Sequence, residues 1–233
     1  MSTTLSVGRA RGRAAARPRR QLVIFAFALA SRGLAAQMPA VPTLQNAFAN
    51  PGFTAAGNIG RADDATAYGL AAAWAPGGAR FVVSGGVGGM NPDAEAGGGT
   101  HFAAGLRVAV PVWRNAAGSF GAAAFGGAGG AWRSRTGMTV VPVGVSVGYR
   151  RVLGERFAVS VYGAPFYAWH RTDLGDETQS ASLFRGSVGL DVGFSPRFGA
   201  TFGVELGGEA DTGDPGPRSP VYGVGVSVAL SGR

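Results

Sequence analysis

The two histidines, His101 and His170, are the side chains best suited to acid–base chemistry near neutral pH. His170 is followed closely by Asp173, Asp176 and Glu177, and a histidine held beside a carboxylate can act as a general base. The spacing places no serine or second histidine where it would complete a catalytic triad. We therefore predict a protein without enzymatic activity. The alternative is an active site around His170 that acts on lipid or peptide.

The remaining reactive residues predict no metal and no cofactor. The chain has no cysteine, which excludes disulfides, thiolate zinc sites and thiol nucleophiles. Acidic residues are frequent in polar stretches, but no stretch has the D-x-D-x-D-G spacing of a calcium loop. The glycine-rich run 85–89 is not followed by a helical pattern or a Lys-Ser/Thr pair, so it does not predict a phosphate loop.

The positive charge of the chain is concentrated near the N-terminus. The formal net charge is +8, and seven of the 21 basic residues, all arginine, precede residue 37. Beyond residue 36 the chain has 14 basic and 13 acidic residues, a balance of +1. A nucleic-acid binder needs a basic patch that neutralises phosphates. We therefore predict no nucleic-acid partner.

The N-terminal region has the order of an export signal. An arginine-rich stretch precedes the apolar run LVIFAFALA at residues 22–30, and small residues follow around Ala35 and Ala36. This run is shorter than the ~20 apolar residues that a transmembrane helix needs. We predict a signal peptide at residues 1–36, followed by an N-terminal segment at 37–52 and one domain at 53–233.

From residue 53 onward, apolar residues recur at every second position and not at helical spacing. In the stretch VVPVGVSVGY, for example, Val141, Val143, Val145 and Val147 share one face. Such alternation is typical of strands with one apolar face. Counting the strong and weak segments together gives ten predicted strands, with eight as the alternative.

The connections between these segments alternate between short turns and longer polar loops. The clearest short turns are 76–79, 113–118, 150–155 and 195–197, and the clearest long loops are 90–99, 170–180 and 209–219. An antiparallel barrel with its turns on one side and its loops on the other produces this order. The predicted fold class is therefore all-β, an up-and-down antiparallel transmembrane β-barrel.

Aromatic residues bracket the four short turns in pairs. The pairs are Trp74 and Phe81, Trp113 and Phe120, Tyr149 and Phe157, and Phe194 and Phe198. Further aromatics, such as Tyr167, Trp169 and Phe184, lie toward the long loops. Two aromatic levels separated by aliphatic residues match the girdles of a barrel in a bilayer, because amphipathic rings favour the headgroup region.

Charged residues occur within several predicted strands, on the face opposite the apolar one. These residues are Arg107, Arg185, Asp191 and Glu205. A soluble sandwich has an apolar interior, so this arrangement favours a polar lumen in which the four charges could pair as a structural cluster. The alternative is that the same faces meet water in a soluble sheet.

Two features conflict with simple alternation. Pro111, Pro142 and Pro165 fall within predicted strands, where each lacks a ladder donor, so we expect them near strand ends or at bulges. Phe120 and Phe125 differ in parity, and one bulge in residues 119–131 would restore the register.

The export signal, the alternating strands, the paired aromatics and the terminal strand VYGVGVSVAL together resemble the small bacterial outer-membrane β-barrel proteins. The resemblance covers the chain from about residue 53. It implies residence in a Gram-negative outer membrane, contact with its lipids and lipopolysaccharide, and delivery by the barrel assembly machinery. Residues 37–52 would then be a periplasmic N-terminal segment, and 53–233 the β-barrel domain. Members often end in an aromatic residue, whereas this chain ends Leu230-Ser231-Gly232-Arg233.

We therefore predict a non-catalytic integral outer-membrane protein with a structural or narrow-pore role. Two alternatives remain, namely a barrel enzyme with a rim site around His170 and a secreted soluble β-barrel or sandwich that binds a ligand. The sequence leaves the oligomeric state open.

Overall fold

The computed structural model describes residues 46–48, 51–63, 65–78, 80–93, 99–134, 136–154, 156–207 and 220–231. The chain divides into two compact units, Met1–Arg32 and Gly33–Arg233, and all described residues belong to the second. The predicted signal peptide and most of the predicted 37–52 segment lie outside the described residues. Within the described ranges, no helix has the length and apolarity that crossing a membrane would require.

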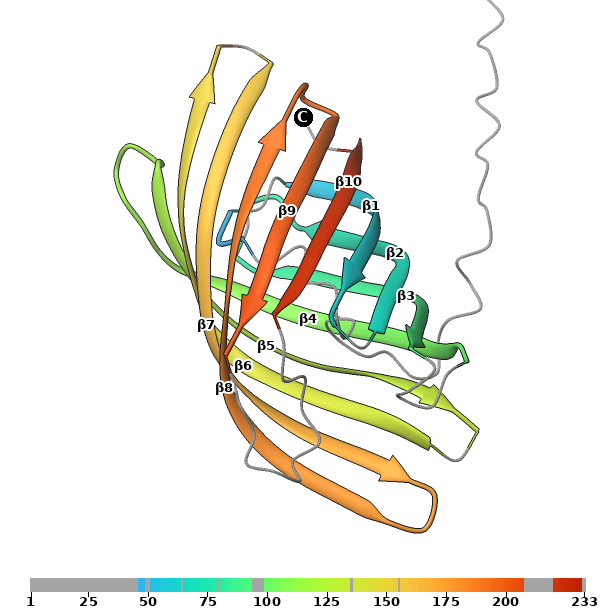
Figure 1. The fold of residues 1–233 in the computed structure, drawn as a ribbon. Helices are drawn as coiled ribbons and strands as arrows, with labels where there is room; N and C mark the ends of the chain where they lie inside the picture. The colour runs from blue at the N-terminus through green and yellow to red at the C-terminus, as the bar shows by residue number, and fades with distance from the viewer. Residues whose placement is uncertain are drawn as a thin grey trace, which may run out of the picture. The chain divides into compact units, whose positions relative to one another are not determined.

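Ten antiparallel strands follow one another along the chain and close into a barrel (Figure 1). Each strand pairs with its sequence neighbours, and β1 pairs with β10. The strands are β1 (Gly52–Arg61), β2 (Ala65–Ala75), β3 (Val82–Pro92), β4 (His101–Arg114), β5 (Phe120–Arg133), β6 (Thr136–Leu153), β7 (Phe157–Leu174), β8 (Thr178–Gly193), β9 (Phe198–Leu206) and β10 (Val221–Ser231). The predicted up-and-down barrel of ten strands is confirmed, and the eight-strand alternative is wrong.

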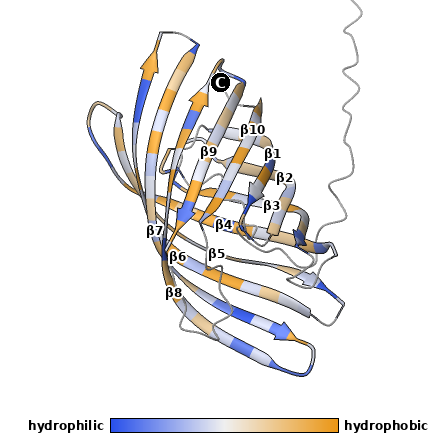
Figure 2. Cartoon of the chain, viewed as in Figure 1, coloured by the Kyte–Doolittle hydropathy of each residue, from blue (hydrophilic) through white to orange (hydrophobic). Residues whose placement is uncertain are grey.

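Burial alternates along the strands because successive side chains point to opposite faces of the barrel wall. On β7, Tyr162, Ala164 and Phe166 are buried, whereas Val161 and Tyr167 are exposed. Figure 2 shows the alternation of polar and apolar residues along the ribbons. Most of the buried apolar residues are alanine, while the large aliphatic and aromatic side chains lie mainly on the outside.

The three prolines lie where the backbone ladder is interrupted. The pairing of β4 with β5 shifts register directly after Pro111. The β5–β6 pairing skips Val141 and Pro142, and the β6–β7 pairing skips Ala164 and Pro165. A proline has no N–H to donate, so it is accommodated where the ladder has a gap. The expected bulge is confirmed for Pro111, but the other two prolines lie inside long strands and not at strand ends.

Phe125 faces the inside of the barrel, whereas Phe120 on the same strand faces outward. Phe120 is 47% exposed and Phe125 is 4% exposed. The pairing of β5 with β6 runs from Phe120 to Gly126 without a register shift. The expected bulge in β5 is therefore wrong, and the register shift lies in the neighbouring strand, beside Pro111.

Candidate functional site in the barrel lumen

A cation–π contact packs Arg107 of β4 against β5 inside the barrel. The Arg107 Cζ atom lies 4.0 Å from the centroid of the Phe125 ring. Phe125 in turn packs against Phe166 of β7, with ring centroids 6.2 Å apart. Arg107 is 4% exposed, so its guanidinium is removed from bulk water and the aromatic face replaces part of that solvation. These three side chains fill part of the middle of the lumen.

Arg185 of β8 and Glu205 of β9 form an ion pair inside the barrel. The Nε atom of Arg185 donates to Oε1 of Glu205 at 2.7 Å, and its Nη1 donates to the Gly207 carbonyl at 2.6 Å. The Arg185 side chain has no exposed surface, and that of Glu205 is 14% exposed. Strand register places Ser187 opposite Glu205, so the ion pair is a diagonal contact across two neighbouring strands.

Asp191 of β8 is held by polar neutral groups. It accepts a hydrogen bond from Oγ1 of Thr201 at 2.6 Å and another from Nδ2 of Asn46. The structure therefore brings Arg185 and Glu205 into direct contact, while Asp191 and Arg107 have the partners described above.

Asn46 is a lumen residue that the sequence did not identify. Its Nδ2 also donates to Oγ of Ser160 on β7 at 2.7 Å. The residue belongs to the segment 37–52, which the sequence predicts to be periplasmic, and the described part of that segment contacts the inner wall of the barrel. No local pattern distinguishes Asn46 from any other polar residue in a linker, so only the folded chain reveals this contact.

A cavity of about 210 Å³ lies in the half of the lumen nearest the short turns. Its polar lining includes Asn46, Arg107, Arg150, Ser160 and Asp191. The polar groups come from the N-terminal segment and from four different strands, so the cavity exists only when the barrel is closed.

The predicted aromatic residues near the short turns lie on or near the outer surface. Trp74, Trp113, Phe120, Phe157, Phe194 and Phe198 are exposed, and Phe81 and Tyr149 are partly buried. The Trp74 and Phe81 rings make an edge contact at 5.7 Å. The rings of Phe120 and Tyr149 lie 4.8 Å apart, so this contact joins the two predicted pairs at neighbouring turns.

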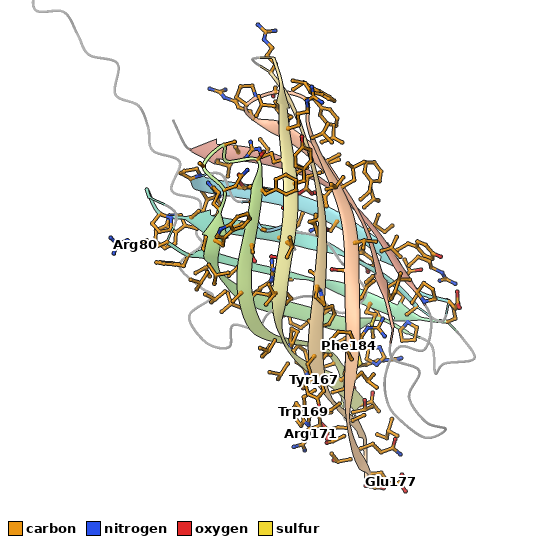
Figure 3. All side chains as sticks on the ribbon, turned by 90° about the vertical axis from the view of Figure 1, so that its left-hand side faces the viewer. Arg80, Tyr167, Trp169, Arg171, Glu177 and Phe184 are labelled. Atoms are coloured by element: carbon orange, nitrogen blue, oxygen red, sulfur yellow. The ribbon has the colours of Figure 1, made fainter. Side chains whose placement is uncertain are left out.

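The outer face near the β7–β8 hairpin carries a second group of aromatics. Figure 3 shows Tyr167, Trp169 and Phe184 on the way to the hairpin turn that carries Glu177. Register pairs Tyr167 with Phe184 across β7 and β8. All three aromatic side chains are exposed. Two aromatic levels, one toward each end of the strands, therefore lie on the outer surface.

The residues of the catalytic alternative are not assembled. His170 is 3% exposed and lies on the inner face of β7. Asp173 lies three residues further along, on the opposite face by alternation, and accepts a hydrogen bond from Oγ1 of Thr178 at 2.8 Å. Asp176 and Glu177 are exposed in the turn. The described residues therefore hold no carboxylate in hydrogen-bond contact with the imidazole.

The described residues form no metal site, and His101 lies apart from His170 on another strand. In the described ranges, no group of three or more His, Asp or Glu side chains could hold a metal ion. His101 lies at the start of β4, where its Nδ1 is 3.3 Å from the Gly99 carbonyl.

Ion pairs at the long-loop end are exposed. Arg61 donates to Asp93 at 2.8 Å, and this hydrogen bond holds the pKa of the Asp93 carboxyl below its ordinary value. The pKa of Asp173 is also lowered, mainly by the hydrogen bond from the Thr178 hydroxyl and to a smaller extent by Arg171. Exposed pairs of this kind contribute little stability, because water screens the charges.

A closed antiparallel barrel with a large apolar outer surface and charged residues inside has the architecture of the outer-membrane β-barrel proteins. The present chain has this architecture, as the sequence predicts.

Comparison with known proteins adds a distant structural likeness. No family model matches the chain, and no curated protein matches it. Among solved structures, the chain is similar to a KdgM porin, with a TM-score of 0.38 and 11% sequence identity. The match covers 76% of this chain and 99% of the porin chain. The class is therefore defined by the topology and surface of the barrel itself.

Proposed function

We propose that this protein is an integral outer-membrane β-barrel without catalytic activity, exported by its N-terminal segment. Its role is that of a structural envelope component or of a narrow passage for small solutes. Outer-membrane lipids and lipopolysaccharide surround it, and the barrel assembly machinery inserts it.

The apolar outer surface is the observation that carries this proposal. Every strand contributes at least one exposed large hydrophobic side chain, and examples are Leu70 at 70%, Phe184 at 67% and Val226 at 64%. A soluble monomer rarely exposes contiguous apolar patches of more than a few hundred Å². A closed barrel leaves no sheet edge in lipid and satisfies its backbone groups within the wall. Lipid is therefore the solvent that fits this surface.

The interior supports a narrow passage more than a wide channel. Arg107, Phe125 and Phe166 pack together inside, and Arg185 and Glu205 occupy another part of the lumen. Side chains fill the interior of a barrel of about eight strands, and the diameter grows with strand number, so a ten-stranded barrel is only slightly wider. Any passage would run between these groups, and solutes larger than a few water molecules would require them to move.

Membrane residence is tested by fractionation and by heat-modifiable migration. We expect the protein to stay in the membrane pellet after carbonate washing, and the folded form to migrate differently from the boiled form on a detergent gel. Release by carbonate without detergent would contradict the membrane assignment and favour the secreted soluble alternative. Identical migration of boiled and unboiled protein would contradict a stable closed barrel.

The passage is tested by single-channel recording in planar bilayers with the purified folded protein. Conductance steps of small amplitude would support the narrow passage. Complete absence of steps, with insertion confirmed by protease protection, would leave the structural role. The rim-enzyme alternative is tested by His170→Ala, since unchanged lipid and peptide processing in cells would exclude it.

A further inference from the structure

The cavity at the short-turn end of the lumen already contains a segment of the chain itself. Asn46, Ala47 and Phe48 line it together with residues of the strands. Ala47 is only 6% exposed. We propose that Asn46–Phe48 is an intramolecular plug that closes the short-turn mouth of the lumen.

Asn46 is the polar anchor of this plug. Its Nδ2 donates to Ser160 at 2.7 Å and to the Asp191 carboxylate, which joins the segment to β7 and β8. Its Oδ1 accepts the backbone N–H of Phe48 at 3.2 Å, and this contact folds the segment into a compact turn. One side chain therefore fixes both the position and the local conformation of the segment.

Phe48 is the apolar anchor, and two glycines make room for it. Gly121 of β5 and Gly148 of β6 are directly paired in the sheet. A Cβ atom at Gly121 would lie 3.2 Å from the Phe48 ring, and one at Gly148 would lie 3.1 Å from the ring and 2.9 Å from the Asn46 Oδ1 atom. The Cζ atom of Arg114 lies over the same ring, 5.4 Å from its centroid. The inner wall is therefore shaped to fit this segment.

The plug lies at one particular end of the barrel. The segment is joined to the start of β1 at Gly52, and β1 begins beside the last residues of β2 and β10. Only three residues separate Phe48 from Gly52 in the sequence, so chain length alone keeps the segment near that end of the barrel. Docking of the segment does not depend on the proposed membrane role, whereas any effect on solute passage does.

The absence of cysteine allows a direct test in the full-length folded protein. A single Ala47→Cys variant is treated with a membrane-impermeant maleimide in detergent, after heat-modifiable migration has confirmed folding. Ala116→Cys, in the exposed turn between β4 and β5, is the matched control. We expect Ala47→Cys to react at least about tenfold more slowly than the control, because an occluded thiol reacts only when the plug opens.

The anchors are tested in the Ala47→Cys background. Asn46→Ala removes a hydrogen bond to a carboxylate and should raise the labelling rate about tenfold. Gly148→Ala should raise it as well, since the added methyl group displaces the same side chain. Asn58→Ala, which changes another inward asparagine on β1, should leave the rate unchanged.

Two outcomes would overturn the plug. One is Ala47→Cys reacting as fast as Ala116→Cys in the folded protein. The other is Asn46→Ala changing the rate no more than Asn58→Ala. Slow labelling of Ala47→Cys in a protein that carbonate releases from membranes would support the plug while contradicting the proposed function, so the two failures are distinguishable.

Discussion

Removal of Glu205 should destabilise the barrel more than removal of both partners of its ion pair. Glu205→Ala leaves the fully buried Arg185 guanidinium without the carboxylate that faces it at 2.7 Å. Breaking one side of a buried ion pair costs about 3–5 kcal/mol. This cost corresponds to a shift of roughly 10² to 10⁴ in the folding equilibrium. Replacement of both residues by methionine keeps the volume and removes both charges, which is often neutral or stabilising.

The assay is equilibrium urea unfolding in detergent micelles, followed by tryptophan fluorescence and by heat-modifiable migration. Glu177→Ala in the exposed β7–β8 turn is the control for loss of one carboxylate, and we expect it to change the free energy of unfolding by less than about 0.5 kcal/mol. The reasoning is refuted if Glu205→Ala costs less than about 1 kcal/mol. It is also refuted if the double methionine variant is as unstable as Glu205→Ala.

Three further predictions concern other parts of the barrel. Gly189→Ala should lower the free energy of unfolding of the barrel by about 1–3 kcal/mol, because an added Cβ would overlap the buried Tyr162 ring. Urea unfolding measures this change. Phe125→Ala should lower the free energy of unfolding by about 3–5 kcal/mol in the same assay, since it removes a buried ring and its contact with Arg107. A decrease of less than about 1 kcal/mol would contradict the packing of Phe125 against Arg107 and Phe166. The pKa of Asp173 is lowered from 3.8, so the hydrogen bonds it accepts stabilise the folded hairpin above pH 3.8 and lose this effect as pH falls through the lower folded value. Titration of its carboxyl signal by NMR checks the direction, and a midpoint above 3.8 would contradict it.

The sequence predicted the barrel because alternation over many strands is a repeated signal. Ten strands, their antiparallel order and the inward direction of Arg107 and Arg185 all follow from a period of two. From the sequence, the parity of Phe125 was explained by a bulge that the structure does not have, because a large ring on an inner wall of small residues looked like a register error. Its cation–π partner is on β4, and that pairing is visible only after the strands have been aligned.

The contacts inside the lumen were harder to predict than the wall. Glu205 and Arg185 lie 20 positions apart in sequence, and only the stagger between β8 and β9 places them diagonally. Asn46 lies 145 positions from Asp191, in a linker without periodicity. Which inward polar side chains contact one another therefore depends on strand register and on chain segments outside the strands. The alternation within a single strand predicts neither of these.

The interruptions at Pro142 and Pro165 have a consequence for the motion of the wall. They lie on the two sides of one strand, since the first interrupts the pairing of β6 with β5 and the second the pairing of β6 with β7. A region with fewer backbone hydrogen bonds opens at a lower free energy than its surroundings. We therefore expect the wall of the barrel to open locally in the middle of β6, where pairs are missing on both sides. Such opening would move the wall beside the packed rings of Phe125 and Phe166.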